Sequence, residues 1–174
     1  RGVTYQQIAK EGGGILTTMK ATRQASLDEL VANGLKLANS ALRYGTTTVE
    51  IKSGYGLSFD SEIRQLEAIA VLKEIAHQNV VPTFLGAHDF PPEYANNRDG
   101  YVELICEEML PAVAEKQLAT FCDAFVDEGY YTTEQGRKIF IRAKELGLKI
   151  KAHADELANV AATELAAEVG AISA

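Results

Sequence analysis

The feature that most constrains the fold of this chain is a regular alternation of helix and strand patterns. At three places an amphipathic helix pattern passes through glycine straight into a strand pattern, at residues 44–46, 146–148 and 169–171. Glycine commonly ends a helix because it adopts left-handed backbone angles without strain. Strands that alternate with helices predict a parallel sheet with right-handed crossovers, and therefore an α/β fold.

Hydrophobic periodicity gives the approximate bounds of the expected elements. Ser26 with Glu29 and Thr132 with Gln135 each have the spacing of a capping box at a helix start. Pro111 is expected to break or restart the helix in which it lies, because proline lacks a backbone N–H. The sequence predicts helices over 27–42, 61–78, 101–117, 133–146 and 157–169, and strands over 46–51, 80–86, 121–127 and 148–153.

The spacing of these units bears on the choice between a closed barrel and an open sheet. Residues 46–170 hold four strand–helix units of about 31 residues each, so eight such units would need about 250 residues, the typical size of a (β/α)8 barrel. The chain would then be half a barrel preceded by a helix. An open doubly wound sheet of this length remains an alternative.

Composition and chain ends narrow the class of protein. A net charge of −7, with scattered basic residues, argues against nucleic-acid binding. No apolar run is long enough for a membrane span. Cys106 and Cys122 form neither a disulfide framework nor a metal clip, so a cytoplasmic location is expected. The chain begins with Arg1 and ends as a strand pattern begins, and we therefore expect 1–174 to be a single incomplete barrel domain.

Polar residues that could carry chemistry follow the predicted strands. Tyr55 stands between two glycines after the first strand, His88 ends the second, and Glu128 follows the third beside Asp127. Each has a plain structural alternative. In these alternatives the glycines serve only the turn, His88 is a buried hydrogen-bonded histidine, and both acids are solvated loop residues. If the acids serve the site, at most one should face inward, because adjacent strand residues point to opposite faces, and Glu128 is weakly preferred.

The fourth predicted strand carries His153, followed three residues later by Glu156. An imidazole at a strand end beside a carboxyl group can supply a metal ligand or base together with a proton-carrying acid. The alternative is an ordinary helix start, because Asp155 and Glu156 complement the helix dipole. Taken together, Tyr55, His88, Glu128 and His153 mark the carboxyl ends of successive strands, where (β/α)8 enzymes place their sites, and this favours the barrel.

Four motifs resemble the imidazolonepropionases, a family of metal-dependent amidohydrolases of histidine breakdown. They are EGGGI at 11–15, TTVEIKSGYGL at 47–57, TFLGAH at 83–88 and KAHADE at 151–156. The resemblance implies strands 2 to 6 of a (β/α)8 barrel, with the flanking strands and a small β-rich domain absent from this chain. It also implies hydrolysis of the cyclic amide of 4-imidazolone-5-propanoate to N-formimidoyl-L-glutamate, one zinc or iron ion, and a homodimer at full length.

The same resemblance assigns roles to single residues. Tyr55 and His88 match substrate-binding positions, His153 matches a metal ligand, and Glu156 matches a catalytic acid that contacts the substrate. Glu128 receives no role. The family's HxH pair, its arginine, a further histidine and an aspartate ligand are absent here, so this chain is expected to bind metal poorly and to be inactive alone. Another amidohydrolase, such as a deaminase, and a non-enzymatic α/β binding domain are the alternatives.

Overall fold

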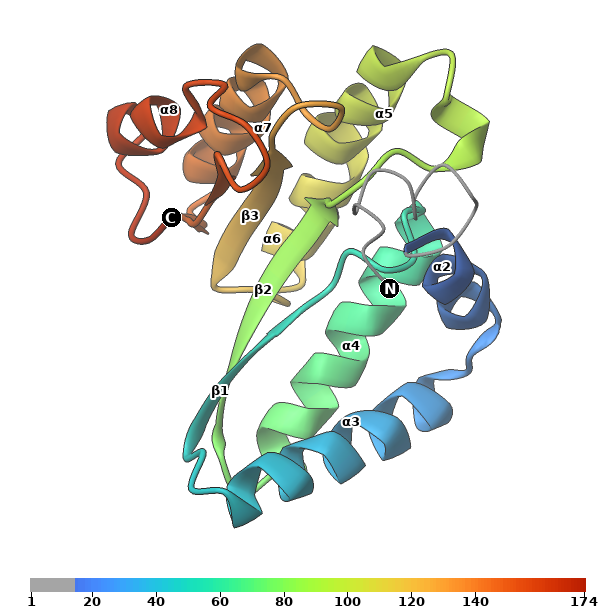
Figure 1. Cartoon of the computed structure of the whole chain (residues 1–174). Coiled ribbons are helices and arrows are strands. Elements are labelled where there is room, and N and C mark those ends of the chain that lie inside the picture. The colour runs from blue at the N-terminus through green and yellow to red at the C-terminus, as the bar shows by residue number, and fades with distance from the viewer. Residues whose placement is uncertain (1–14) are drawn as a thin grey trace, which may run out of the picture.

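The computed structural model describes residues 15–174, and the first four residues of the motif at 11–15 lie outside the described residues. Helices and parallel strands alternate along the chain, with α3 and α4 lying along one side of β1 and β2 (Figure 1). The helices are α2 (Ile15–Gln24), α3 (Leu27–Arg43), α4 (Phe59–Ile75), α5 (Arg98–Leu104), α6 (Leu110–Glu115), α7 (Thr133–Glu145) and α8 (Ala162–Glu168). The strands are β1 (Thr48–Lys52), β2 (Asn79–Ala87), β3 (Phe121–Val126), β4 (Lys149–Ile150) and β5 (His153–Ala154).

The strand order identifies the sheet as part of a (β/α)8 barrel. Strands β1, β2, β3 and β4 pair in sequence order and in parallel, while β5 follows β4 and also pairs with β3. A doubly wound sheet reverses its order at a switch point, whereas a barrel adds each strand beside the last. After α8 the chain returns to the sheet, where the Ile172 N–H donates to the Ile150 carbonyl at 2.8 Å. The predicted partial barrel and its parallel sheet are therefore confirmed.

Side chains alternate between two faces of this sheet. We call the side that packs on the helices the helix face; it carries Val49, Phe84, Cys122, Val126 and Ile150. The opposite side, the polar face, carries a connected set of hydrogen-bonding side chains. They are Glu50, Lys52, Thr83, Asp123, Lys151 and His153.

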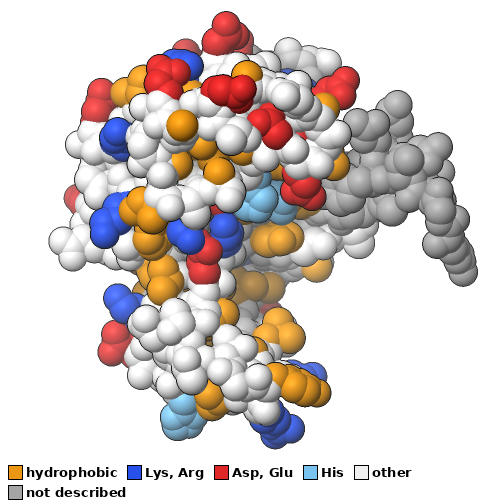
Figure 2. All heavy atoms as spheres, turned by 60° about the vertical axis from the view of Figure 1, so that its left-hand side comes forward, with side chains coloured by type: hydrophobic (Ala, Val, Ile, Leu, Met, Phe, Trp, Pro, Cys, Tyr) orange, Lys and Arg blue, Asp and Glu red, His pale blue; other side chains and the backbone are white. Residues whose placement is uncertain are grey.

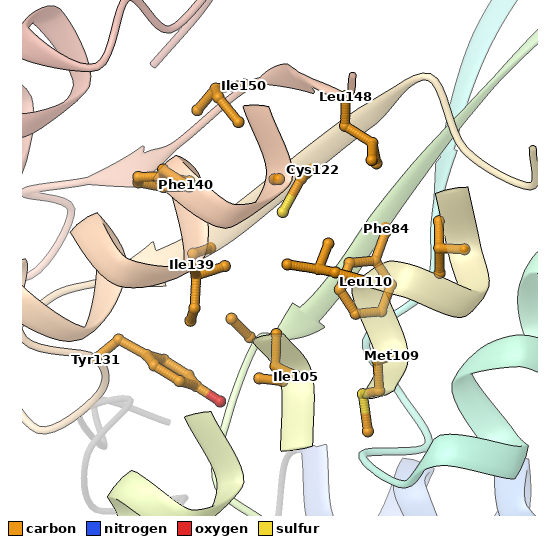
Figure 3. Packing of buried hydrophobic residues seen from close by; sticks show 14 of the residues in the cluster. Phe84, Ile105, Met109, Leu110, Cys122, Tyr131, Ile139, Phe140, Leu148 and Ile150 are labelled. Carbon is orange, nitrogen blue, oxygen red and sulfur yellow. The ribbon is translucent and has the colours of Figure 1, made fainter. Parts of the chain in front are cut away.

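The helix face forms the core. In Figure 3, Phe84 and Cys122 from the strands pack with side chains of the helices that follow them, such as Leu110 and Phe140. Two fully buried tyrosines end this core at the carboxyl edge of the sheet. The Tyr101 hydroxyl donates to the Gly86 carbonyl at 3.1 Å, and the Tyr131 hydroxyl donates to the Asp89 carbonyl at 3.0 Å. These bonds fix the chain on both sides of His88.

Both predicted capping boxes are present, at the starts of α3 and α7. The prediction that Pro111 breaks or restarts its helix is confirmed, because α6 starts at Leu110 with the proline in its first turn. A π-helical turn, η2 (Ile105–Met109), joins α5 to α6, and the Leu110 N–H donates to the Ile105 carbonyl five residues back. This turn lets the helical path continue through the proline, which lies in the first turn of α6.

The predicted helix over 157–169 begins later than expected, at Ala162. Two carboxylates bind the preceding backbone N–H groups in a loop. Asp127 accepts from Leu157 at 2.7 Å and from Ala158 at 3.0 Å, and Asp155 accepts from Val160, Ala162 and Thr163. The predicted strand over 148–153 is likewise divided into β4 and β5. No helix in the described part of the chain is long and apolar enough to cross a membrane.

Candidate functional site

Aromatic side chains from four strand ends form one row along the carboxyl edge of the sheet. The ring centroids of Tyr55 and His88 are 5.1 Å apart, those of His88 and Phe125 are 6.3 Å apart, and those of Phe125 and His153 are 5.8 Å apart. Figure 2 shows histidine side chains near the middle of the visible face, next to a group of basic and acidic ones. The structure therefore brings together Tyr55, His88 and His153, which lie about a hundred residues apart in sequence.

His88 is held in one tautomer by its neighbours. Its Nδ1 lies 3.0 Å from the Gly54 carbonyl, which can only accept, so Nδ1 carries the proton and Nε2 is left as an acceptor. Burial lowers the pKa of His88, which favours the neutral ring. The ring follows an irregularity in β2, where the pairing with β3 shifts between Phe84 and Ala87. Gly86 permits this path, because a Cβ there would lie 2.4 Å from the Phe84 ring.

His153 is oriented by Asp123, a strand residue that is only 1% exposed. Its Nδ1 lies 3.1 Å from Oδ1 and 3.0 Å from Oδ2 of Asp123, and Asp123 Oδ1 also accepts from the His153 backbone N–H. The hydrogen bond that the ring donates to Asp123 raises the pKa of His153. With Nδ1 donating to the carboxylate, Nε2 is directed away from it, the arrangement usual for histidine ligands of metals.

Lys52 completes the surroundings of Asp123. Its Nζ donates to Asp123 Oδ2 at 2.6 Å. Burial raises the pKa of the Asp123 carboxyl, but hydrogen bonds and charge from His153 and Lys52 outweigh burial and hold the pKa below its usual value. Asp123 is therefore an ionised carboxylate that accepts hydrogen bonds from Lys52 and His153. These bonds link β3 to β1 and to β5.

A metal ion would find one suitable ligand here. Among residues 15–174, no group of three or more His, Cys, Asp or Glu side chains is arranged to hold a metal. Structural and catalytic zinc sites take three or four protein ligands. The described residues therefore fit one ligand position, Nε2 of His153, and do not form a complete set.

Glu156 lies at the same hollow as His153. This hollow has a volume of about 340 Å³ and is lined by polar-face residues together with the returning chain at Ser173 and Ala174. Glu156 is exposed at its rim. The hollow thus places a solvent-accessible carboxyl group near an oriented imidazole, as the spacing of residues 153 and 156 predicts.

The two acids after β3 have separate roles. Glu128 is exposed, whereas Asp127 is buried and accepts backbone N–H groups from Leu157 and Ala158. The weak preference for Glu128 as the inward acid is therefore wrong, because the loop before α8 turns its N–H groups toward Asp127. The prediction that at most one of the pair faces inward is confirmed.

Sequence reasoning missed the ionic network of the polar face. Glu50 Oε1 accepts from Thr83 Oγ1 at 2.5 Å and lies 3.6 Å from Lys52 Nζ, and Glu50 Oε2 accepts from Lys151 Nζ at 3.0 Å. The available signal was charge at alternate positions within apolar strands, at residues 50 and 52 and again at 151 and 153. Charges so placed share one face of a sheet and pair there.

The chain is similar to bacterial imidazolonepropionases over its whole length. It is 51% identical to the protein of Alkaliphilus oremlandii over 100% of this chain and 53% identical to that of Symbiobacterium thermophilum over 99% of it. It is 49% identical to the protein of Thermoanaerobacter pseudethanolicus over 100% of this chain. No family model matches the chain.

These relatives are much longer than the chain, which spans 41% of the first two and 42% of the third. The matched region nevertheless covers all four segments that carry the aromatic row. Imidazolonepropionases are hydrolases, and the partial barrel with its site at the carboxyl edge has the architecture that the resemblance implies. Over its whole length, the chain is thus similar to about two fifths of an imidazolonepropionase.

Proposed function

We propose that the full-length protein containing this chain hydrolyses the cyclic amide of 4-imidazolone-5-propanoate to N-formimidoyl-L-glutamate. Water adds to the ring carbonyl carbon, the ring C–N bond breaks, and the departing nitrogen takes a proton. The observation that carries this proposal is the single row formed by Tyr55, His88 and His153 at the carboxyl edge. The identity of about half of all positions to proteins of that name supports the choice of substrate.

His153 is proposed as one ligand of a zinc or iron ion, through Nε2. A bound ion would act as a Lewis acid toward the amide carbonyl and toward water. Asp123 contributes by holding Nδ1–H, which fixes both the tautomer and the ring plane of His153. The other ligands would come from residues outside the described part of the chain.

Tyr55 and His88 are proposed to bind the substrate ring. With its Nδ1–H donated to the Gly54 carbonyl, neutral His88 presents Nε2 as an acceptor for a ring N–H. The Tyr55 ring packs edge-on against His88 and is 40% exposed, so its hydroxyl is open to a ligand. Two groups on separate strand ends would hold a flat ring in one orientation, which lowers the entropic part of the barrier.

Glu156 is proposed as the acid that protonates the departing nitrogen. Its carboxyl group lines the hollow that His153 also lines. A positioned carboxyl that transfers a proton in the transition state contributes about 100- to 10,000-fold in rate. Glu156 is exposed in this structure, so its carboxyl group is accessible to a substrate in the hollow.

The remaining expectations also belong to the full-length protein. We propose that residues 1–174 are part of one catalytic barrel domain, completed by sequence outside this chain, since the relatives are more than twice as long. Two buried free thiols support a cytoplasmic location. The net charge of −7 supports a small-molecule enzyme without a nucleic-acid or membrane partner, and a homodimer is the proposed assembly.

The test is an assay of the full-length protein with 4-imidazolone-5-propanoate, with product identified by mass spectrometry and metal counted by elemental analysis. We expect N-formimidoyl-L-glutamate and about one zinc or iron ion per chain. Glu156→Gln should lower turnover about 100-fold or more while metal content is retained. Ammonia release from aminated rings without hydrolysis of this amide would identify a deaminase, and a folded protein free of metal would reject the proposal.

A further inference from the structure

A fully buried glutamate lies beneath the loop that presents Tyr55. Glu62, in the first turns of α4, has no exposed surface. Its Oε2 accepts from the Gly54 N–H at 2.7 Å, and its Oε1 accepts from the Gly56 and Leu57 N–H groups, both at 2.9 Å. One carboxylate therefore binds three of the four backbone N–H groups from residue 54 to residue 57.

Arg23 binds the same loop from the other side. Its Nε donates to the Gly56 carbonyl at 2.6 Å, and its Nη2 donates to the Leu57 carbonyl at 2.9 Å. The backbone between these partners has little freedom. Gly54 has a φ of +99°, and a Cβ on Gly56 would lie 2.1 Å from the Ser61 hydroxyl oxygen.

The loop bonds lead directly to the candidate site. The remaining N–H of the loop, that of Tyr55, donates to Gln65 Oε1 at 3.3 Å, and Gln65 Nε2 donates to Glu62 Oε1 at 3.1 Å. The Gly54 carbonyl meets His88 Nδ1. Glu62 thus holds Gly54 and Gly56, the residues on both sides of Tyr55. Through Gln65 it also supports the Gly54–Tyr55 peptide, whose carbonyl sets the tautomer of His88.

Helix capping alone does not account for this arrangement. Ser58, at the N-cap of α4, makes no side-chain cap hydrogen bond. A glutamate in a capping box binds the N-cap N–H three residues before it. Glu62 instead reaches back five, six and eight residues, to the part of the loop that carries Tyr55.

We propose that Glu62, with Arg23 as its counterpart on the carbonyl side, is a positioning residue that holds Tyr55 against His88 for ligand binding. The catalytic part of this inference rests on the proposed function. Neither Glu62 nor Arg23 touches the substrate. Their contribution is the fixed geometry of two groups that do.

The test variant is Glu62→Gln in the full-length protein. A glutamine amide places an NH2 group where one carboxylate oxygen accepts loop N–H groups, so at least one buried loop N–H loses its acceptor. Glu74→Gln is the matched control, because Glu74 is an exposed carboxylate on the same helix. Arg23→Lys is the second variant, which weakens the carbonyl side if Glu62→Gln does not fold.

The first readout is structural and independent of activity. Protein labelled with 3-fluorotyrosine gives a fluorine resonance for Tyr55, identified by its loss in Tyr55→Phe. We expect this resonance to move or broaden in Glu62→Gln and in Arg23→Lys, and to stay unchanged in Glu74→Gln. An unmoved Tyr55 resonance in folded Glu62→Gln, or in Arg23→Lys if the first variant does not fold, overturns the proposal whatever the activity.

The second readout is a double-mutant cycle on kcat/KM. Displacement of a binding group by about 1 Å can cost about 100-fold, and we expect Glu62→Gln to cost about 10- to 100-fold in the wild-type background. In a Tyr55→Phe background the same change should cost at least about threefold less, since the positioned hydroxyl is already absent and only the effect on His88 remains. An equal loss in both backgrounds would assign Glu62 a general structural role and overturn the proposal. Absence of turnover in the wild-type protein would reject the proposed function alone, because the fluorine readout would still decide on Glu62.

Discussion

The two faces of the same sheet are built from alternate residues of the same strands, yet they differ in almost every physical property. In β3, Cys122, Ala124 and Val126 are buried against helices, whereas Asp123 between them binds Lys52 and His153. The helix face is stabilised by apolar burial, and the polar face by directed hydrogen bonds and charge. Alternate positions of one strand therefore contribute either to the stability of the fold or to the polar site. Substitutions on the two faces should consequently have separable effects on stability and on activity.

The largest effect is expected at the polar face. His153→Ala in the full-length protein should reduce turnover more than about 1000-fold, because it removes the proposed metal ligand, and a metal ion stabilises the transition state by several kcal/mol. The melting temperature should change little, since the ring is partly exposed. Turnover within tenfold of wild type would break the proposed division between the faces.

Core truncation on the helix face should show the opposite pattern. Phe140 is fully buried in α7, and Phe140→Ala should lower the free energy of unfolding by about 3–5 kcal/mol, measured by urea denaturation. The matched control is Phe121→Ala, because Phe121 is partly exposed on the polar face beneath Lys151. The control should cost less than half as much, and equal costs would contradict the comparison.

Asp123 sharpens the comparison, because it is buried like a core residue but belongs to the polar face. Asp123→Asn removes the carboxylate that orients His153 and should lower metal affinity or activity by about 10- to 100-fold. Metal titration of the full-length protein measures this loss. Glu128→Gln, an exposed acid after the same strand, should leave both properties unchanged.

The smallest effect concerns the thiols of the helix face. Burial raises the pKa of Cys106 to about 11 and holds the pKa of Cys122 well above its usual value. Little thiolate is therefore present at neutral pH, and neither thiol should react with iodoacetamide in the folded protein. Mass spectrometry should detect alkylation of both only after denaturation. Rapid alkylation of native Cys106 would show that this part of the core opens.

Much of this architecture could be predicted from sequence, because it depends on local patterns. The alternation of helix and strand, both capping boxes and the returning strand after Gly170 follow from periodicity and glycine placement. Tyr55, His88 and His153 were identifiable because each follows a strand, and parallel strands bring their carboxyl ends to one edge.

The rest depends on contacts between distant segments. In the sequence, Asp123 is a single acid in an apolar strand, and only the fold brings Lys52 and His153 beside it. Glu62 reads as a first-turn helix acid, although its partners are loop N–H groups before the helix. The late start of α8 has the same origin, since Asp127 holds N–H groups about thirty residues away. Long-range satisfaction of buried polar groups leaves little local signal.

The central claim is that three strand ends form one metal-assisted site around Tyr55, His88 and His153. Its most direct test is a crystal structure of the full-length protein grown with zinc, with anomalous maps recorded across the zinc edge. We predict a single zinc peak about 2.0–2.1 Å from Nε2 of His153, in the mouth that Tyr55 and His88 also face. A zinc ion bound away from His153, or these three side chains turned to separate surfaces, would contradict the account.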